Sequence, residues 1–465
     1  MKIALIEPIP RTNLYFFVGK LPLLGPLYLG TLLKQAGHEV KVFKEDFTRM
    51  YNERKDELHP YIKEADVVGL TAVTHTVHRA YQIADAIKRQ FPGKKVIMGG
   101  NHPSARPEEA AEHCDHVVVG EAEPKVREIF ENPTERIIRG ARPDINDLPI
   151  LDLSLLQDYK RNARSKYRDI APMSASRGCP HDCIFCSVTQ MFGRKVRVRD
   201  ADLVMEEFRM RYDEGYRFAF FYDDNFAANK TKTKILLEKM IQADLDFEWS
   251  SQFDIHVARD QELLDMLKKA KCRTLWLGTE SVNPDSLKDY HKNQSPEMVK
   301  DSIAKIRAAG MRTHSMFIFG ADSDTEESIK ETVRFAKECG TETAQFSVLY
   351  PIPGTQLYDN LAAQNRIFVD DWKYFDGSHS VVIPKNLTPL KLQKLSIRSY
   401  RSFYRTKGLL PWLGTLVGFM VWKLLDRKYM RHLRRVSRQL TLQNVSARRR
   451  EKLKRFGPLN WLPEE

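Results

Sequence analysis

The sequence has little cysteine and no apolar run long enough to cross a membrane. Six cysteines in 465 residues are too few for a disulfide framework, and three of them stand alone in apolar surroundings, as ordinary buried thiols do: Cys114, Cys272 and Cys339. The uncharged run at residues 409–422 has 14 residues, against about 20 needed for a bilayer span. The N-terminus lacks the charged head and apolar run of a secretory signal, so we expect a cytoplasmic location.

Acidic residues are scarce at the C-terminal end. Residues 401–465 hold 16 Lys or Arg against 4 Asp or Glu, so +12 of the net charge of +13 lies there and the rest is nearly neutral. Next to the apolar run 409–422, with Trp412 and Trp422 suited to lipid headgroups, this tail predicts peripheral contact through residues 409–465 with the inner face of the membrane. Nucleic acid is a less favoured partner, because no known binding module is visible.

Short apolar runs alternate with amphipathic segments over the first 130 or so residues. This βαβ alternation predicts an α/β, doubly wound (Rossmann-like) domain over residues 1–138, whose ligand lies beyond the C-terminal strand ends. The expected helices are 27–35, 78–91 and 107–112, and the expected strands are 2–6, 39–43, 67–71, 95–98 and 116–119.

A second α/β series follows a proline-containing linker, residues 139–165. Six strand candidates with helical segments between them predict an open, partial (β/α)6 barrel over residues 166–370. They lie at residues 170–176, 218–222, 247–252, 274–277, 313–319 and 343–349. The remaining residues, 371–465, are expected to form a helical extension with a basic tail.

The other three cysteines stand close together directly after the first strand of the second series. Cys179, Cys183 and Cys186 have C-x3-C-x2-C spacing, and three thiolates on one loop can hold three irons of a [4Fe–4S] cluster and leave the fourth iron open. The alternative interpretation is a zinc site with His181 or another residue as the fourth ligand. We favour the cluster because a barrel places its active site where this loop lies, at the C-terminal end of a strand.

This motif, with an aromatic residue before the last cysteine, resembles the radical S-adenosylmethionine superfamily. The resemblance implies that the open iron binds S-adenosylmethionine, which is cleaved by one electron to a 5′-deoxyadenosyl radical that abstracts a substrate hydrogen. It continues through Tyr222–Phe226, Gly278–Ser281, Phe317–Gly320 and Pro351–Thr355. On this resemblance, the residues expected near S-adenosylmethionine are Phe185, Asp223, Asp224, Glu280, Ser281, Phe319 and Gly320.

Each of these later motifs also has a plainer interpretation. Asp223 and Asp224 could cap a helix, Glu280 could be a surface carboxylate, and the glycines could be turn formers. Because all of them fall at predicted strand ends in the order of the family, we favour the functional interpretation.

A doubly wound domain placed before such a barrel resembles the cobalamin-binding module of one subgroup of the family. The resemblance implies corrinoid contacts from Thr71, Thr74, Gly99, Gly100, Asn101, Gly120 and Glu121. The D-x-H-x-x-G motif, which supplies a lower-axial histidine in many cobalamin domains, is absent after the first strand. The alternatives are a domain that binds no corrinoid and, for His75 and His102, ordinary loop residues.

Together these features predict a cobalamin-dependent radical enzyme that modifies an unactivated carbon of a hydrophobic, lipid-like substrate, most simply by methylation. Its electron donor would be a protein such as flavodoxin or ferredoxin. The second hypothesis is an oxidative cyclase of a porphyrin-type substrate, since the subgroup includes an anaerobic cyclase of this kind. A methylthiotransferase would need three cysteines in the first domain, where only Cys114 stands. The hypothesis from another class is a non-catalytic corrinoid or cluster carrier.

Overall fold

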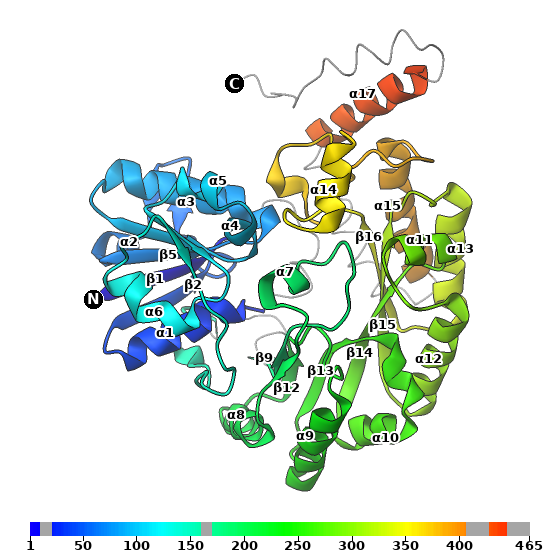
Figure 1. Cartoon of the computed structure of the whole chain (residues 1–465), viewed down its shortest axis with the longest axis horizontal. Coiled ribbons are helices and arrows are strands. Elements are labelled where there is room, and N and C mark those ends of the chain that lie inside the picture. Colours follow the sequence, from blue (N-terminus) through cyan, green and yellow to red (C-terminus); the bar gives the residue numbers. More distant parts are fainter. Residues whose placement is uncertain (10–20, 160–169, 406–426, 444–465) are drawn as a thin grey trace.

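Two parallel sheets lie side by side in the computed structural model, which describes residues 1–9, 21–159, 170–405 and 427–443 (Figure 1). The first sheet, blue to cyan in the figure, belongs to the N-terminal part of the chain. The second, green to yellow, forms the larger half of the molecule. Helix α7, Val188–Phe192, lies between the two halves.

The first sheet has six parallel strands in the order β2-β1-β5-β6-β7-β8. From β1 the chain builds outward in one direction through β2 and in the other through β5 to β8. The order therefore reverses beside β1, which is the point where doubly wound sheets bind ligands. The strands are β1 Lys2–Glu7, β2 Glu39–Lys44, β5 Val67–Thr71, β6 Lys95–Gly99, β7 His116–Val119 and β8 Ile137–Arg139.

Helices cover both faces of this sheet, which explains its nearly continuous apolar strands. Along β1, Ile3 and Leu5 pack into one core cluster and Ala4 and Ile6 into another. The helices are α1 Leu24–Gln35, α2 Pro60–Glu64, α3 Val77–Gln90, α4 Asn101–Ala105, α5 Pro107–Ala111 and α6 Val126–Glu131, with 3-10 turns η2 Thr74–Thr76 and η3 Glu123–Lys125. A short hairpin, β3 Tyr51–Asn52 and β4 Glu57–Leu58, lies apart from the sheet.

The second sheet also has six parallel strands, and their order in space is their order in the chain. Its two edge strands, β9 and β16, do not pair with each other, so the barrel is open. The strands are β9 Ile170–Met173, β12 Phe218–Phe221, β13 Glu248–Phe253, β14 Cys272–Glu280, β15 Arg312–Phe319 and β16 Thr343–Val348. This confirms the predicted fold class, and each strand lies within a few residues of its expected range.

Helices cover the outer face of the barrel sheet. They are α8 Ala201–Asp213, α9 Lys230–Ala243, α10 Gln261–Lys269, α11 Pro284–Asp289, α12 Pro296–Ala308 and α13 Glu326–Glu338, with the 3-10 turn η6 Ile255–Arg259. Helix α14, Gln356–Ala363, lies instead near α7, and Leu357 N donates to Ile184 O at 3.0 Å (Figure 1). Leu275 and Leu277 of β14 point outward into the core beneath these helices. Side chains at the alternate positions face the barrel interior, where Trp276 of β14 stacks with His314 of β15.

The expected linker is a packed segment in its described part. Its leucines, among them Leu151, Leu153 and Leu155, are buried in the core on the α1 side of the first sheet. Leu156 forms an isolated bridge with Val42. A 3-10 turn, η4 Leu153–Leu155, lies here. The prolines of this segment therefore interrupt regular secondary structure, but the segment is packed against the first sheet and is not a flexible connection.

The C-terminal extension closes one end of the barrel. Helix α15, Pro389–Arg405, packs on β16, where the hydroxyl of Ser396 donates a hydrogen bond to Phe346 O at 3.0 Å. Helix α17, Arg427–Gln443, is held by a hydrogen bond from Tyr429 Oη to Ser380 O at 2.6 Å. No helix in the described residues is long and apolar enough to cross a membrane, and the run 409–422 lies outside those residues.

Candidate active site

The three clustered cysteines lie on a loop at the C-terminal end of the first barrel strand. Two short antiparallel strands, β10 Ser176–Arg177 and β11 Arg197–Val198, form a hairpin whose connecting segment contains this loop. Gly178 starts it at φ +91°, and a Cβ there would lie 2.8 Å from Lys195 O, so only glycine fits. The amide of Cys186 donates to Cys183 O at 3.1 Å, which folds the second half of the loop into a turn.

The thiols of the loop are partly exposed and protonated at neutral pH. Burial raises the pKa of Cys183 to about 11 and that of Cys186 to about 12, and it also raises the pKa of Cys179. Thiolates on this loop therefore need a bound metal to stabilise them. Among the described residues no three metal-ligating side chains are gathered into a ready-made ion site, so the fit rests on the donor chemistry: three cysteines on one accessible loop, as an iron–sulfur cluster requires.

His181, the expected fourth ligand of a zinc site, is engaged elsewhere. Its Nε2 lies 3.2 Å from Asp254 Oδ2 at the end of β13. Burial alone would raise the pKa of Asp254, but hydrogen bonds from His181 and from the amide of His256, together with nearby positive charge, hold it well below its usual range. Asp254 is therefore a carboxylate that holds the His181 ring, which disfavours the zinc interpretation.

Asp223 and Asp224, at the end of β12, support the start of the cysteine loop. Asp223 is fully buried and accepts hydrogen bonds from Ala175 N at 2.9 Å and from the Ser176 hydroxyl. Asp224 is partly exposed and accepts from Gly178 N at 3.3 Å. Burial raises the pKa of Asp223 to about 7 and that of Asp224 to about 6.

These contacts give the carboxyl groups of Asp223 and Asp224 different surroundings. Neither caps a helix, since helix α9 is capped by Asn229. The side chain of Asp223 is buried beneath the β9–β10 turn, where both of its oxygens accept hydrogen bonds, and its contact with S-adenosylmethionine stays a prediction. Asp224 remains a candidate for that contact.

Glu280 pairs with a lysine that the sequence did not point to. Glu280 Oε1 lies 3.1 Å from Lys292 Nζ, and both side chains are almost fully buried. Burial alone would lower the pKa of Lys292, but Glu280, Cys183 and Asp254 raise it well above its usual value. Lys292 therefore stays charged beside the cysteine loop. Lys292 lies in a loop, without the apolar periodicity of a helix or strand, so only the folded structure shows that it lies beside Glu280.

Ser281, predicted near S-adenosylmethionine, has a local structural contact. It is buried, and its hydroxyl accepts a hydrogen bond from Asn283 N at 3.0 Å, which shapes the turn into α11. Phe185, which lies in the cysteine loop, packs edge-on against Tyr290 with ring centroids 5.3 Å apart, and its contact with S-adenosylmethionine stays a prediction.

Phe319 is the last residue of β15. Strand alternation turns its side chain to the helix-covered face, where it is buried and stacks on Phe346 with ring centroids 5.6 Å apart. Only its backbone lies toward the barrel end, and its contact with S-adenosylmethionine stays a prediction. Gly320 follows it with its amide bound to Asp324 Oδ2 at 2.7 Å, and a Cβ there would lie 2.9 Å from the Leu392 side chain.

The glycine turns of the first domain face the segment that follows the cysteine loop. Asn101 Nδ2 lies 3.4 Å from Ser187 Oγ, and Gly120 N donates to Ser104 Oγ at 2.9 Å. A cavity of about 170 Å³ lies here. Its lining residues come from both halves of the chain: Asn101, Ser104, Val119, Gly120, Ser187, Gln190 and Met191. The predicted corrinoid edge thus adjoins the cysteine loop.

The other residues predicted at this edge differ in accessibility. Thr71 and Gly99 are partly exposed at the ends of β5 and β6. Thr74 is buried, with Oγ1 3.3 Å from His102 Nδ1, and His102 itself is an interior residue. Gly100 allows a close approach to the backbone of Ala72 that no other residue permits.

Glu121 binds the second half of the molecule. Its side chain is 1% exposed, and its two oxygens accept hydrogen bonds from Arg177 at 2.7 Å and from Arg197 at 2.6 Å. Both carboxylate oxygens therefore bind the hairpin that frames the cysteine loop, and a corrinoid contact of Glu121 stays a prediction. The sequence showed its place at a strand end but could not show its long-range partners.

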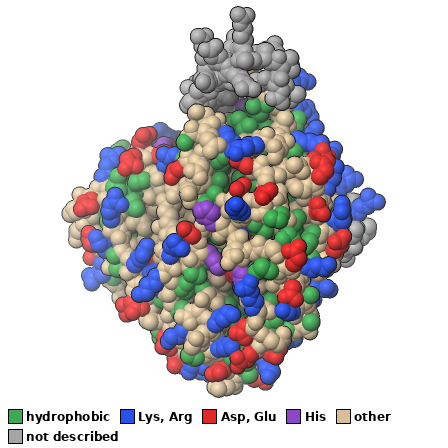
Figure 2. All heavy atoms as spheres, turned by 45° about the vertical axis from the view of Figure 1, so that its right-hand side comes forward, with side chains coloured by type: hydrophobic (Ala, Val, Ile, Leu, Met, Phe, Trp, Pro, Cys, Tyr) green, Lys and Arg blue, Asp and Glu red, His purple; other side chains and the backbone are tan. Residues whose placement is uncertain are grey.

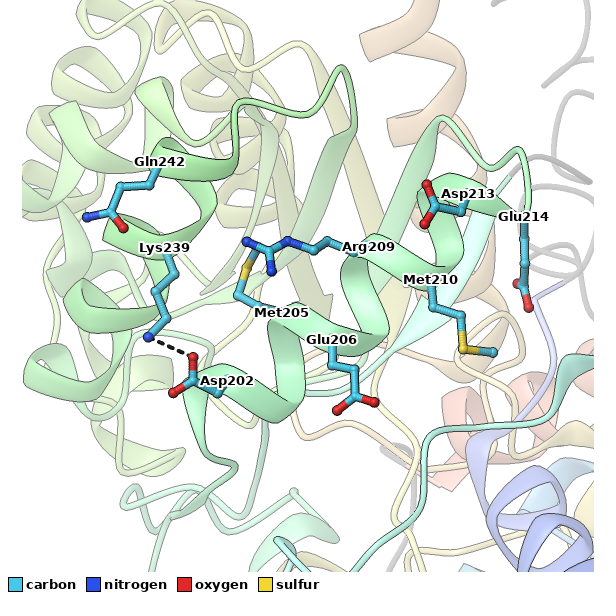
Figure 3. Close-up of a pocket in the computed structure, with 9 residues that line it drawn as sticks. All are labelled: Asp202, Met205, Glu206, Arg209, Met210, Asp213, Glu214, Lys239 and Gln242. Carbon is cyan, nitrogen blue, oxygen red and sulfur yellow. Dashed lines mark hydrogen bonds and ion pairs between the residues drawn. The ribbon is translucent and has the colours of Figure 1, made fainter.

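A larger groove of about 760 Å³ lies away from this chemistry, between α8 and α9 (Figure 3). Acidic and basic side chains line it, with Lys239 paired to Asp202 at 2.7 Å. None of the predicted cluster, S-adenosylmethionine or cobalamin residues borders it. The accessible thiols, not the size of this groove, therefore locate the candidate active site.

Comparison with known proteins agrees with this geometry. The family model described as "Radical SAM superfamily" matches residues 173–336, and the model described as "B12 binding domain" matches residues 16–130. The chain is 31% identical over 360 residues to the bacteriochlorophyllide d C-12(1)-methyltransferase of Chlorobaculum tepidum, which covers 74% of this chain and 76% of that relative. The chain belongs to the radical SAM superfamily.

The B12-binding model places this radical SAM enzyme among members with such a domain, and two further similarities extend over most of the chain. It is 28% identical over 451 residues to the anaerobic magnesium-protoporphyrin IX monomethyl ester cyclase of Cereibacter sphaeroides, covering 89% of this chain and 72% of the relative. Its fold matches the radical S-adenosylmethionine methyltransferase TsrM from Kitasatospora setae, with a TM-score of 0.62, 19% identity and coverage of 78% and 75%. The predicted cofactors, a [4Fe–4S] cluster, S-adenosylmethionine and cobalamin, are those of this family.

Proposed function

We propose that this radical SAM enzyme methylates an unactivated carbon of a hydrophobic small molecule. The observation that carries the proposal is the adjacency of two sites, because Ser187 and helix α7, which directly follow the cysteine loop, border one cavity with the glycine edge of the B12-binding domain. The similarity to a bacteriochlorophyllide methyltransferase supports methylation. The similarity to a magnesium-protoporphyrin ester cyclase favours, as the second candidate, oxidative cyclisation of a porphyrin-type substrate.

The chain's own residues have distinct roles in this proposal. Cys179, Cys183 and Cys186 hold the cluster, and Lys292 keeps a positive charge beside Cys183. When bound, the cluster with S-adenosylmethionine supplies one-electron hydrogen abstraction, and cobalamin supplies a transferable methyl group. The proposed domains are 1–138 for cobalamin and 166–370 for the radical chemistry.

The other cofactor contacts are proposals of the same kind. Asp224, Glu280 and Gly320 lie at ends of barrel strands where S-adenosylmethionine would bind beside the loop. Thr71, Gly99 and Gly100 lie at the edge of the first sheet, where Gly100 brings backbone groups close to a corrinoid. A flavodoxin- or ferredoxin-type protein is the proposed electron donor.

Peripheral contact with a membrane is also proposed, through α17. This helix presents five exposed cations and no acidic residue along one face: Lys428, Arg431, Arg434, Arg435 and Arg438. Over the face of the molecule in Figure 2, by contrast, Lys and Arg side chains are interspersed with Asp and Glu. An anionic lipid surface fits the α17 face because each cation near it contributes about 1 kcal/mol.

The decisive experiment compares wild type with Cys183→Ala after anaerobic reconstitution with iron, sulfide and cobalamin. Removing one of the three cluster ligands should abolish dithionite-driven release of 5′-deoxyadenosine from S-adenosylmethionine, while the fold, measured by circular dichroism, stays intact. The matched control is Cys339→Ala, which alters a buried thiol at the end of α13 and should keep full activity.

Three results would count against the proposal. A Cys183→Ala protein that still releases 5′-deoxyadenosine would overturn the cluster assignment. A wild-type protein with four irons but no corrinoid would overturn methylation through cobalamin. A loaded protein that does not cleave S-adenosylmethionine would support the non-catalytic carrier.

A further inference from the structure

Two arginines and two glutamates form a buried ion-pair network between the halves of the molecule. Arg177 donates to Glu121 and to Glu123, each at 2.7 Å, and Arg197 donates to Glu121 at 2.6 Å. The four side chains are at most 15% exposed. The network is electrically neutral, and its hydrogen bonds are shared: Arg177 donates to two glutamates through different nitrogens, and Glu121 accepts from two arginines through different oxygens, which favours a single geometry.

The network holds both ends of the cysteine loop. Arg177 immediately precedes Gly178 and Cys179, and Arg197 is its partner in the β10–β11 hairpin. The Arg177 guanidinium also lies over the ring of the buried Tyr28 from α1, 5.2 Å from its centroid. The loop that carries the three thiols therefore starts and ends on side chains that the B12-binding domain holds in place.

The same segment of the first domain reaches the cavity. Gly120, next to Glu121, lines it, and a Cβ on Gly120 would meet no atom within 4 Å. On the opposite wall Ser187 follows Cys186 directly. A ligand bound between these walls would contact residues adjacent to the network on one side and to the cluster ligands on the other.

We propose that Glu121 and Glu123 are positioning residues that couple the two cofactor sites, so that S-adenosylmethionine at the cluster changes the affinity of the first domain for cobalamin. The inference rests on the proposed function, because it needs both cofactors to bind. Coupling between sites is reciprocal, so either cofactor can report it. The network supplies the physical connection, since moving the glutamates moves both ends of the loop.

The test measures the dissociation constant of hydroxocobalamin by quenching of protein fluorescence, on cluster-loaded protein, with and without S-adenosylmethionine. Wild type is expected to show at least about a fivefold difference between the two conditions. Glu121→Gln keeps the size of the side chain but removes its charge, and should bring the ratio close to one while iron content and the electron paramagnetic resonance signal of the reduced cluster stay those of a [4Fe–4S] cluster.

Two further variants accompany this test, the first as a second test of the network and the other as a control. Arg197→Lys keeps the charge but replaces by one ammonium the two nitrogens that donate separately to Glu121 and to Pro143 O, so it should also reduce the ratio if Glu121→Gln fails to fold. Asp371→Asn is the matched control: it weakens another contact between the halves, to His78 at 3.0 Å, without touching the cysteine loop, and should keep the wild-type ratio.

The outcomes separate this inference from the proposed function. A wild-type ratio of one, or an unchanged ratio in Glu121→Gln and Arg197→Lys, would refute the coupling while both cofactors still bind. An equal loss in Asp371→Asn would show that any contact between the halves has this effect and would also refute it. Failure of wild type to bind cobalamin or cluster would instead contradict the proposed function.

Discussion

At the residue scale, a partly buried histidine of the barrel interior, His314, has a measurable effect on stability. His314 stacks on Trp276 with ring centroids 4.1 Å apart, and its Nε2 is buried without a hydrogen bond among the described residues. Burial lowers its pKa from 6.5 to about 4. The unfolded chain therefore binds this proton near pH 6.5 and the folded chain only near pH 4, so stability falls as the pH drops through that window.

His314→Gln removes this titration and keeps a polar group next to Thr343. We expect the loss in free energy of unfolding between pH 7 and pH 5 to shrink by roughly 1–2 kcal/mol relative to wild type. Urea unfolding of the two proteins at both pH values measures the difference. An equal loss in both proteins would show that His314 is already protonated in the folded state at pH 5.

At the element scale, the turn from β6 into α4 depends on one of its two adjacent glycines. Gly100 has φ +106°, and a Cβ there would lie 2.6 Å from Ala72 O, whereas a Cβ on Gly99 would make an ordinary contact of 3.6 Å with Val118. Gly100→Ala should therefore cost about 1–3 kcal/mol of stability and weaken cobalamin binding.

Gly99→Ala is the matched control for this turn, with an expected cost below about 1 kcal/mol. Urea unfolding and hydroxocobalamin titration measure both variants. If the two substitutions lower the free energy of unfolding equally, the positive φ of Gly100 is not what the turn requires.

Membrane contact is a property of the whole molecule, because it depends on which charged faces point outward together. Arg434, Arg435 and Arg438 of α17 are exposed and make no ion pair with other described residues. Reversing all three to Glu should weaken binding to vesicles of phosphatidylcholine and phosphatidylserine by at least about tenfold. Sedimentation with vesicles measures the bound fraction, and vesicles of phosphatidylcholine alone should bind little of either protein.

A second charge reversal of equal size tests whether vesicle binding depends on the α17 face or only on the net charge of the protein. Lys394, Arg398 and Arg401 form an exposed row on α15, and their reversal to Glu should leave vesicle binding nearly unchanged. Equal weakening by both reversals would assign the effect to net charge. Weakening of RNA binding instead of vesicle binding would favour the nucleic acid interpretation.

The sequence by itself determined the elements and their order. Alternation of apolar runs located the strands of both sheets, because burial on two faces requires continuous apolar residues in each strand. The spacing of Cys179, Cys183 and Cys186 indicated cluster chemistry, because all three donors lie within one loop and need no distant partner. Gly100 was found in the same way, from a local turn.

Only the tertiary structure decided which side chains face the candidate site. Phe319 turned outward because α13 and α15 cover that face, and Asp223 was buried beneath the β9–β10 turn. Glu121 and Lys292 took partners 56 and 12 residues away, Arg177 and Glu280. A buried charged group forms an ion pair only with a group that the fold brings next to it. The free energy of burying the charge therefore depends on this partner and not on the neighbouring residues in the sequence.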